Sequence, residues 1–245
     1  MRPYQFTKSY ELFSEAQKII PGGVQASRRP LVPGRAPVYI DHAKGCRCWD
    51  VDGNEYIDFC LSWGPIILGY AYDPVDEAAI EMIRKGIVFT QNHPIQNELA
   101  EKLCQLIPCA EMVTFMKTGS EVTSVAVRIA RAYTGREKIA RCGYHGWHDW
   151  CNVGGNGVPK VLEGQTLEFD GNRPETLERL FEENPDEIAG VIIAPEEVVP
   201  PDRSKFERIK EITHRHGAIL IFDEVKTWPR ISLGGFQEWI GVIPD

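Results

Sequence analysis

The sequence predicts an α/β protein in which a mostly parallel sheet is wrapped by helices, after an N-terminal helix and a small antiparallel meander. From residue 112 onward, short apolar runs alternate with amphipathic helical segments, which is typical of a parallel sheet. In the stretch 217–225 an apolar run leads without a break into two adjacent acids, Asp223 and Glu224, as expected for a parallel strand buried on both faces. Residues 38–59 instead show short alternating runs separated by turn residues, which indicates antiparallel hairpins.

Residues 1–65 are expected to form the N-terminal helix and the meander. In residues 9–20 the apolar side chains recur with helical spacing, and Pro21-Gly22-Gly23 ends that helix.

Beyond residue 65, a helix is expected that opens with Asp73 as N-cap, has Pro74 in its first turn and ends near residue 86.

Residues 66–245 are expected to form one large domain. After a helix at 95–106, strands are predicted at 112–116, 138–142, 191–194 and 217–225. Helices are predicted to begin at Ser120 and Pro174, and a further helix is marked by Phe206, Ile209 and Ile212. The residues expected on the inner face of helix 120–133 are Val122, Val125, Ala126, Ile129 and Tyr133.

Composition argues against several classes of partner. The chain has 27 Lys and Arg against 35 Asp and Glu, a net charge of -8, and no basic cluster, so we expect neither nucleic acid nor membrane as partner. No window reaches the length of a membrane span, and the start has no apolar signal-like segment. Seven cysteines without a regular framework fit a reducing compartment, so the sequence predicts a cytoplasmic protein.

The ends of three predicted strands carry distinctive residues, and such ends lie along one edge of a parallel sheet. At the first, Thr118, Gly119 and Ser120 lead into a helix whose free N–H groups suit an anion such as phosphate. The simpler alternative is that Thr118 or Ser120 only caps the helix.

The second strand end is an aromatic loop, 142–151. Tyr144 is placed to stack on a planar heterocycle, and the alternative is a surface loop with aromatic anchors. A further alternative is a zinc site made of Cys142, His145, His148 and Cys151, although their uniform spacing does not match the usual paired arrangement.

The third strand end is Asp223. A carboxylate in a low-dielectric setting needs a positive partner, and the alternative is a helix cap or an arginine pair. Together, an anion site, an aromatic platform and a buried carboxylate match the phosphate, the ring face and the ring nitrogen of pyridoxal phosphate.

Several segments carry a resemblance to a known family. Residues 12–17, 20–24, 49–54, 63–65 and 130–136 are similar to the class III aminotransferases of fold type I, and most closely to glutamate-1-semialdehyde aminomutase and its relatives. The resemblance implies the large domain of a fold type I pyridoxal phosphate transferase. It also implies transfer of an amino group on a small amino or keto acid, by a homodimer with its site at the subunit interface.

Carried over by position, the resemblance implies a set of site residues. Gly119 and Ser120 would hold the cofactor phosphate, to which Thr118 could add a hydroxyl donor, and Arg29 and Trp63 would contact the substrate. The residues implied at the cofactor ring are Tyr144, with the adjacent His145, Asp223 at the ring nitrogen, and Val225 on the other face.

The Schiff-base lysine of the family is expected beyond Asp245, with the small C-terminal domain, so no catalytic residue is assigned within the chain. Lys226 is not a substitute, because side chains alternate along a strand and those of Lys226 and Asp223 should point to opposite sides. We therefore expect little or no turnover from these residues alone. The alternatives are a non-catalytic module that binds pyridoxal phosphate or a partner protein, and the zinc protein.

Overall fold

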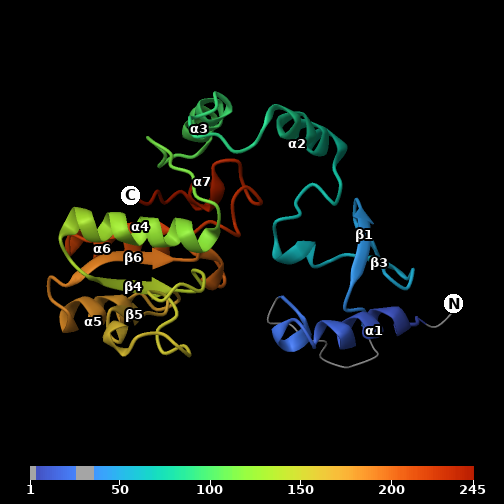
Figure 1. Cartoon of the computed structure of the whole chain (residues 1–245). Coiled ribbons are helices and arrows are strands. Elements are labelled where there is room, and N and C mark those ends of the chain that lie inside the picture. The colour runs from blue at the N-terminus through green and yellow to red at the C-terminus, as the bar shows by residue number, and fades with distance from the viewer. Residues whose placement is uncertain (1–3, 26–35) are drawn as a thin grey trace. The chain divides into compact units, whose positions relative to one another are not determined.

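The computed structural model describes residues 4–25 and 36–245 and divides into two compact units, Met1–Thr90 and Gln91–Asp245 (Figure 1). This division lies later in the chain than the boundary after residue 65 that the sequence suggests. The helix at 73–85 therefore falls in the first unit, and the boundary of the functional domain stays a prediction.

The first unit contains the predicted helix and antiparallel meander, with strand order β1-β2-β3. The buried Asp50 carboxylate at the end of β2 accepts hydrogen bonds from the Tyr56 hydroxyl at 2.6 Å and from the Asn54 side-chain amide at 2.7 Å. These bonds tie β2 to β3 across their turn. The elements are α1 (Thr7–Ala16), η1 (Pro21–Gly23), β1 (Ile40–Lys44), β2 (Arg47–Asp50), β3 (Glu55–Ile57), η2 (Leu61–Trp63) and α2 (Asp73–Lys85).

The second unit alternates helices and strands, as predicted. Its four-stranded sheet has the order β5-β4-β6-β7, and all three strand pairs are parallel. This confirms the predicted α/β class. The elements are α3 (Ile95–Leu106), α4 (Gly119–Thr134), β4 (Lys138–Cys142), η3 (Lys160–Leu162), β5 (Thr166–Glu168), α5 (Glu175–Glu183), β6 (Ile188–Ile193), η4 (Pro195–Glu197), α6 (Arg203–Arg215), β7 (Ile219–Phe222) and α7 (Gly235–Ile240).

Helices cover both faces of this sheet (Figure 1). On one face, Val127 of α4 packs against Ile139 and Ile192, and Gly190 allows close approach, because a Cβ there would lie 3.1 Å from the Cβ of Ala130. On the other face, α5 and α6 build the larger core. That core includes Leu177, Phe181, Val191, Ile193, Phe206, Ile209 and Ile212, all fully or almost fully buried.

Three details differ from the sequence predictions. Residues 112–116 form no strand, because no described strand lies beside them to complete a hydrogen-bond ladder, and Met112 is 91% exposed. β7 is shorter than the predicted 217–225 and is only partly buried, because it pairs with β6 alone. The strand buried on both faces is β6.

The orientation of α4 also differs. Its buried residues are Thr123, Val127 and Ala130, whereas Ile129 and Tyr133 of the predicted inner face are exposed. Apolar residues occupy two sides of this helix, so helical spacing alone does not identify the side that packs on the sheet. In the part of the chain that the structure describes, no helix is long and apolar enough to cross a membrane.

Candidate functional site

A cavity of about 190 Å³ lies in the second unit where β4 and β7 end and α4 begins. This is the edge of the sheet at which the sequence predicts a site. The cavity brings together all seven residues predicted to contact a cofactor, namely Thr118, Gly119, Ser120, Tyr144, His145, Asp223 and Val225. Their roles toward a cofactor stay predictions.

The first wall is the N-terminus of α4. Thr118 is its N-cap and forms a capping box with Glu121, in which Thr118 Oγ1 accepts from the Glu121 amide while the Glu121 carboxylate accepts from the Thr118 amide. The capping alternative therefore holds for Thr118. Among the described residues, the amides of Gly119 and Ser120 have no protein acceptor and remain available to an anion.

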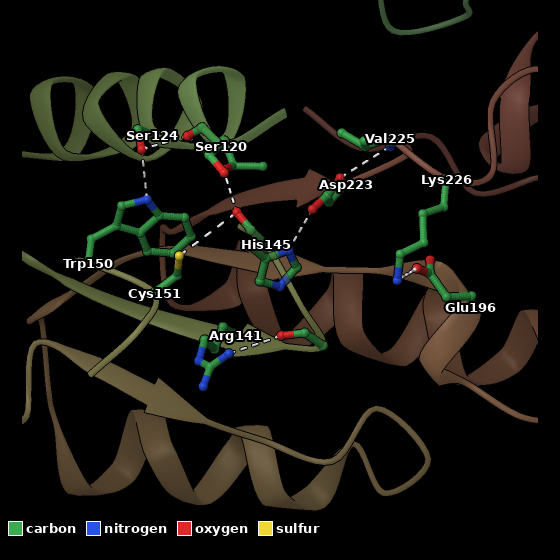
Figure 2. A network of polar contacts seen from close by, with 12 residues as sticks. Ser120, Ser124, Arg141, His145, Trp150, Cys151, Glu196, Asp223, Val225 and Lys226 are labelled. Carbon is green, nitrogen blue, oxygen red and sulfur yellow. Dashed lines mark hydrogen bonds and ion pairs between the residues drawn. The ribbon is translucent and has the colours of Figure 1, made fainter. Parts of the chain in front are cut away.

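The second wall is the end of β7, where Asp223 is buried. Its amide donates to the Ile193 carbonyl at 2.9 Å, which continues the ladder between β7 and β6 for one residue. Its Oδ2 atom lies 2.7 Å from Nδ1 of His145, which is also buried (Figure 2). An ionised carboxylate only accepts, so this nitrogen carries the proton. The Nε2 atom of His145 is buried and has no partner in the described chain.

Two side chains present flat or apolar surfaces to the cavity. Tyr144, which follows β4, keeps 60% of its surface exposed, and Val225 keeps 56%. Val225 lies against the start of α4, because a Cβ on Gly119 would lie 3.2 Å from its Cγ1 atom.

The loop after β4 is fastened to α4 by side-chain hydrogen bonds. Thr123 donates to the His145 carbonyl at 2.7 Å. Trp150 Nε1 donates to Ser124 Oγ at 2.9 Å (Figure 2). Gly146 has a φ of +108°, and a Cβ there would lie 2.3 Å from Ser120 Oγ. These contacts hold Tyr144 and His145 in place beside the helix N-terminus.

The zinc alternative finds no support in the geometry. Within residues 4–25 and 36–245, no group of three or more His, Cys, Asp or Glu side chains could hold a metal ion. His145 pairs with Asp223, and His148 Nδ1 lies 2.7 Å from Ser124 Oγ. Burial raises the pKa of the Cys142 and Cys151 thiols, which opposes formation of the thiolates that zinc binds.

Four further residues line the cavity that sequence reasoning did not assign to it, Thr123, Gly146, Glu196 and Lys226, and the last two are charged. The prediction that Lys226 and Asp223 point to opposite sides is wrong, because both line this one cavity. Side chains alternate only within a strand, and β7 ends at Phe222, so that the chain turns from Val225 onward. The signal available in the sequence was the pair of acids, Glu196 and Glu197, in the short helix η4 that follows β6.

Two residues, Arg29 and Trp63, are expected to contact substrate. Arg29 lies outside the described residues. Trp63 belongs to the first unit, in the 3-10 helix η2, and 63% of its surface is exposed. Their roles toward a substrate therefore stay predictions.

Comparison with known proteins agrees with the resemblance. The family model for class-III aminotransferases matches residues 32–153. The 3-aminobutyryl-CoA aminotransferase of Cloacimonas acidaminovorans is 46% identical over 250 residues, which cover 98% of this chain and 60% of that protein. The chain thus spans about three fifths of the length of this relative.

Solved structures show the same fold. A transaminase with bound pyridoxal phosphate is 30% identical and superposes with a TM-score of 0.91, covering 99% of this chain and 61% of the other. A glutamate-1-semialdehyde aminomutase from Pseudomonas aeruginosa PAO1 is 23% identical, with a TM-score of 0.84, and covers 98% of this chain and 56% of the other. At that identity the likeness shows the fold alone. Residues 32–153 thus match the class-III aminotransferases, and the chain as a whole is similar in sequence and fold to a transaminase that binds pyridoxal phosphate.

Proposed function

We propose that this chain supplies the cofactor-binding part of an aminotransferase that uses pyridoxal phosphate to move an amino group between a small amino acid and a keto acid. One observation carries the proposal. The free amides at the start of α4, the Tyr144 ring and the buried Asp223 carboxylate all line one cavity. These are the groups that a phosphate, a flat ring and a protonated ring nitrogen require.

The residues present fit the cofactor. The amides of Gly119 and Ser120 would bind the phosphate, supported by the helix dipole. Tyr144 and Val225 would bracket the ring, and Asp223 would accept a hydrogen bond from its protonated nitrogen. The Nε2 atom of His145 is buried without a hydrogen-bond partner among the described residues, so this part of the site lacks a polar group beside the imidazole.

When bound, pyridoxal phosphate acts as an electron sink for the charge that develops at the substrate carbon. Asp223 supports this chemistry because its negative charge favours a proton on the ring nitrogen. His145 holds the Asp223 carboxylate in one orientation through the 2.7 Å hydrogen bond. Tyr144 and Val225 fix the plane of the ring and exclude water from its faces.

For the substrate, the similarity to a 3-aminobutyryl-CoA aminotransferase favours a 3-amino acid or its thioester as amino donor. The aminomutase likeness rests on the fold alone, so transfer to a separate keto acid is preferred over an exchange within one molecule. We also expect a homodimer, as the family resemblance implies.

Two measurements test this proposal. The residues assigned here to the cofactor all belong to this chain, whereas amino transfer in the family also needs the lysine expected beyond Asp245. We expect the chain to bind pyridoxal phosphate. A polypeptide that also carries that lysine should transfer the amino group of 3-aminobutyrate, or of its CoA thioester, to 2-oxoglutarate only when the cofactor is present. Binding without transfer by the longer polypeptide would favour the non-catalytic module, and absence of binding would exclude both.

A further inference from the structure

Lys226 places a positive charge in the cavity beside the groups already described. Among the described residues that line the cavity, it contributes the one Lys or Arg side chain. Its Nζ atom lies 2.8 Å from Oε1 of Glu196 and 5.8 Å from the centre of the Tyr144 ring. The ammonium group is therefore held over the ring that is expected to face the cofactor.

The pairing with Glu196 leaves one carboxylate oxygen unsatisfied. Oε2 of Glu196 is buried and has no hydrogen-bond partner in the part of the chain that the structure describes. Such atoms are uncommon in folded proteins and often mark a place where another group binds. An ion pair as exposed as this one, with 50% of the Lys226 side chain accessible, adds little stability by itself. Stability alone therefore does not account for a lysine and a glutamate at this position.

Lys226 is also separated from the predicted phosphate site. In Figure 2 its side chain lies on the other side of Asp223 from Ser120, which marks the start of α4. A phosphate at the helix N-terminus would therefore leave the ammonium group free for another anion. The hydrogen bond to Glu196 raises the pKa of Lys226, so the side chain remains cationic near neutral pH.

We propose that Lys226 is a binding residue for an anionic oxygen of the ligand in this cavity, and that Glu196 holds its ammonium group in place until the ligand arrives. This inference rests on the proposed function. The anionic oxygen has two possible sources with the same chemistry, the phenolate of the cofactor ring and the carboxylate of an amino acid substrate. Either would replace the Glu196 carboxylate as the partner of Lys226 through a charge-assisted hydrogen bond.

Two stable adducts distinguish these sources by equilibrium binding. N-(5′-phosphopyridoxyl)-β-alanine carries the phenol and a carboxylate, whereas N-(5′-phosphopyridoxyl)propylamine carries the phenol alone. Their affinities would be measured by tryptophan fluorescence for the unaltered chain, for Lys226→Met and for the control Lys160→Met, whose side chain is exposed and does not line the cavity. Near-ultraviolet circular dichroism would verify that the variants are folded.

We expect Lys226→Met to weaken binding about tenfold or more, and Lys160→Met to leave it unchanged. A loss for the β-alanine adduct alone assigns Lys226 to the substrate carboxylate, and an equal loss for both adducts assigns it to the phenolate. Unchanged affinity for both adducts in Lys226→Met would overturn this inference while leaving the proposed function intact. Failure of the unaltered chain to bind either adduct would instead contradict the proposed function.

Discussion

His145 and Asp223 are joined by a buried hydrogen bond of 2.7 Å between Nδ1 and Oδ2, although they come from the ends of different strands. The His145 side chain is fully buried and that of Asp223 is 6% exposed. A carboxylate in such surroundings is stable only with a donor beside it. The imidazole at Oδ2 and the Val225 amide, which donates to Oδ1 at 3.2 Å, together fix the orientation of the carboxylate.

Removing this donor should weaken cofactor binding through Asp223. We expect His145→Ala to lower the free energy of unfolding by about 1–3 kcal/mol, because it leaves the buried Oδ2 atom of Asp223 without its donor, while Oδ1 keeps the Val225 amide. His145→Asn keeps a side-chain N–H and should recover part of the affinity for pyridoxal phosphate. Fluorescence titration and chemical denaturation measure the two effects.

His214→Ala is the matched control, because His214 is exposed on α6 and pairs with Asp245 rather than lining the cavity. If His145→Ala and His214→Ala bound the cofactor equally well, His145 would have no positioning role.

The glycine after His145 gives a second prediction. A Cβ on Gly146 would overlap Ser120 Oγ, at 2.3 Å, in addition to the strain of its positive φ. Gly157 also has a positive φ, but a Cβ there would meet no atom within 4 Å. Gly157→Ala therefore measures the cost of the positive φ without a steric overlap. Gly146→Ala should therefore lower the free energy of unfolding by about 1 kcal/mol or more beyond the loss in Gly157→Ala, as measured by chemical denaturation. Equal losses would mean that the contact with Ser120 is not tight.

The Lys226 amine should react slowly with acylating reagents at neutral pH. Its pKa is raised, first through the hydrogen bond that it donates to Glu196, so the reactive neutral amine forms only at higher pH than for an ordinary lysine. Glu196→Gln removes that charge and should move the labelling curve to lower pH. Mass spectrometry of the Lys226 peptide across a pH series measures the curve, with Lys160 as the internal reference. Superimposable Lys226 curves in both proteins would show that Glu196 does not control this amine.

The hydrogen-bonded Asp50 carboxylate should make the stability of the first unit sensitive to acid. Burial acts to raise its pKa, but hydrogen bonds from Tyr56, Asn54 and Asp52 outweigh burial, and the folded pKa is lowered. The stabilisation is therefore present above the unfolded pKa of about 4 and is lost as the pH falls through the folded pKa. Tyr56→Phe removes one of these bonds, so its free energy of unfolding should vary less across that acidic range. The exposed Tyr133→Phe should leave the pH dependence unchanged, and a steeper acid dependence in Tyr56→Phe would contradict the assignment.

The alternation of apolar runs and amphipathic helices was sufficient to predict the parallel sheet. Each of these two patterns can be recognised within a single segment of the chain, without knowledge of its neighbours. The same local logic identified Asp223 and Tyr144, which follow β7 and β4, and the start of α4, where Gly119 follows the N-cap Thr118. Local pattern did not reveal that residues 112–116 lack a neighbouring strand, because pairing depends on distant residues.

The remaining errors have related causes. Val122 and Ile129 have helical spacing, but so do Val127 and Ala130, and only packing on the sheet decides which set is buried. Lys226 was placed by extending strand alternation past Phe222, where the chain has already turned. Its pairing with Glu196 joins the ends of β6 and β7 and has no local signature in the sequence.

The most direct test of the account is a titration of the chain with pyridoxal phosphate, followed by tryptophan fluorescence, before and after Asp223→Ala. The loop that carries His145 also contains Trp147 and Trp150, so cofactor binding should quench emission. We expect saturable quenching by the unaltered chain, and affinity lower by about tenfold or more in Asp223→Ala, because a charge-assisted hydrogen bond to the ring nitrogen is lost. Equal affinity in the two proteins would contradict the role of Asp223, and no saturable binding by the unaltered chain would contradict the cofactor site itself.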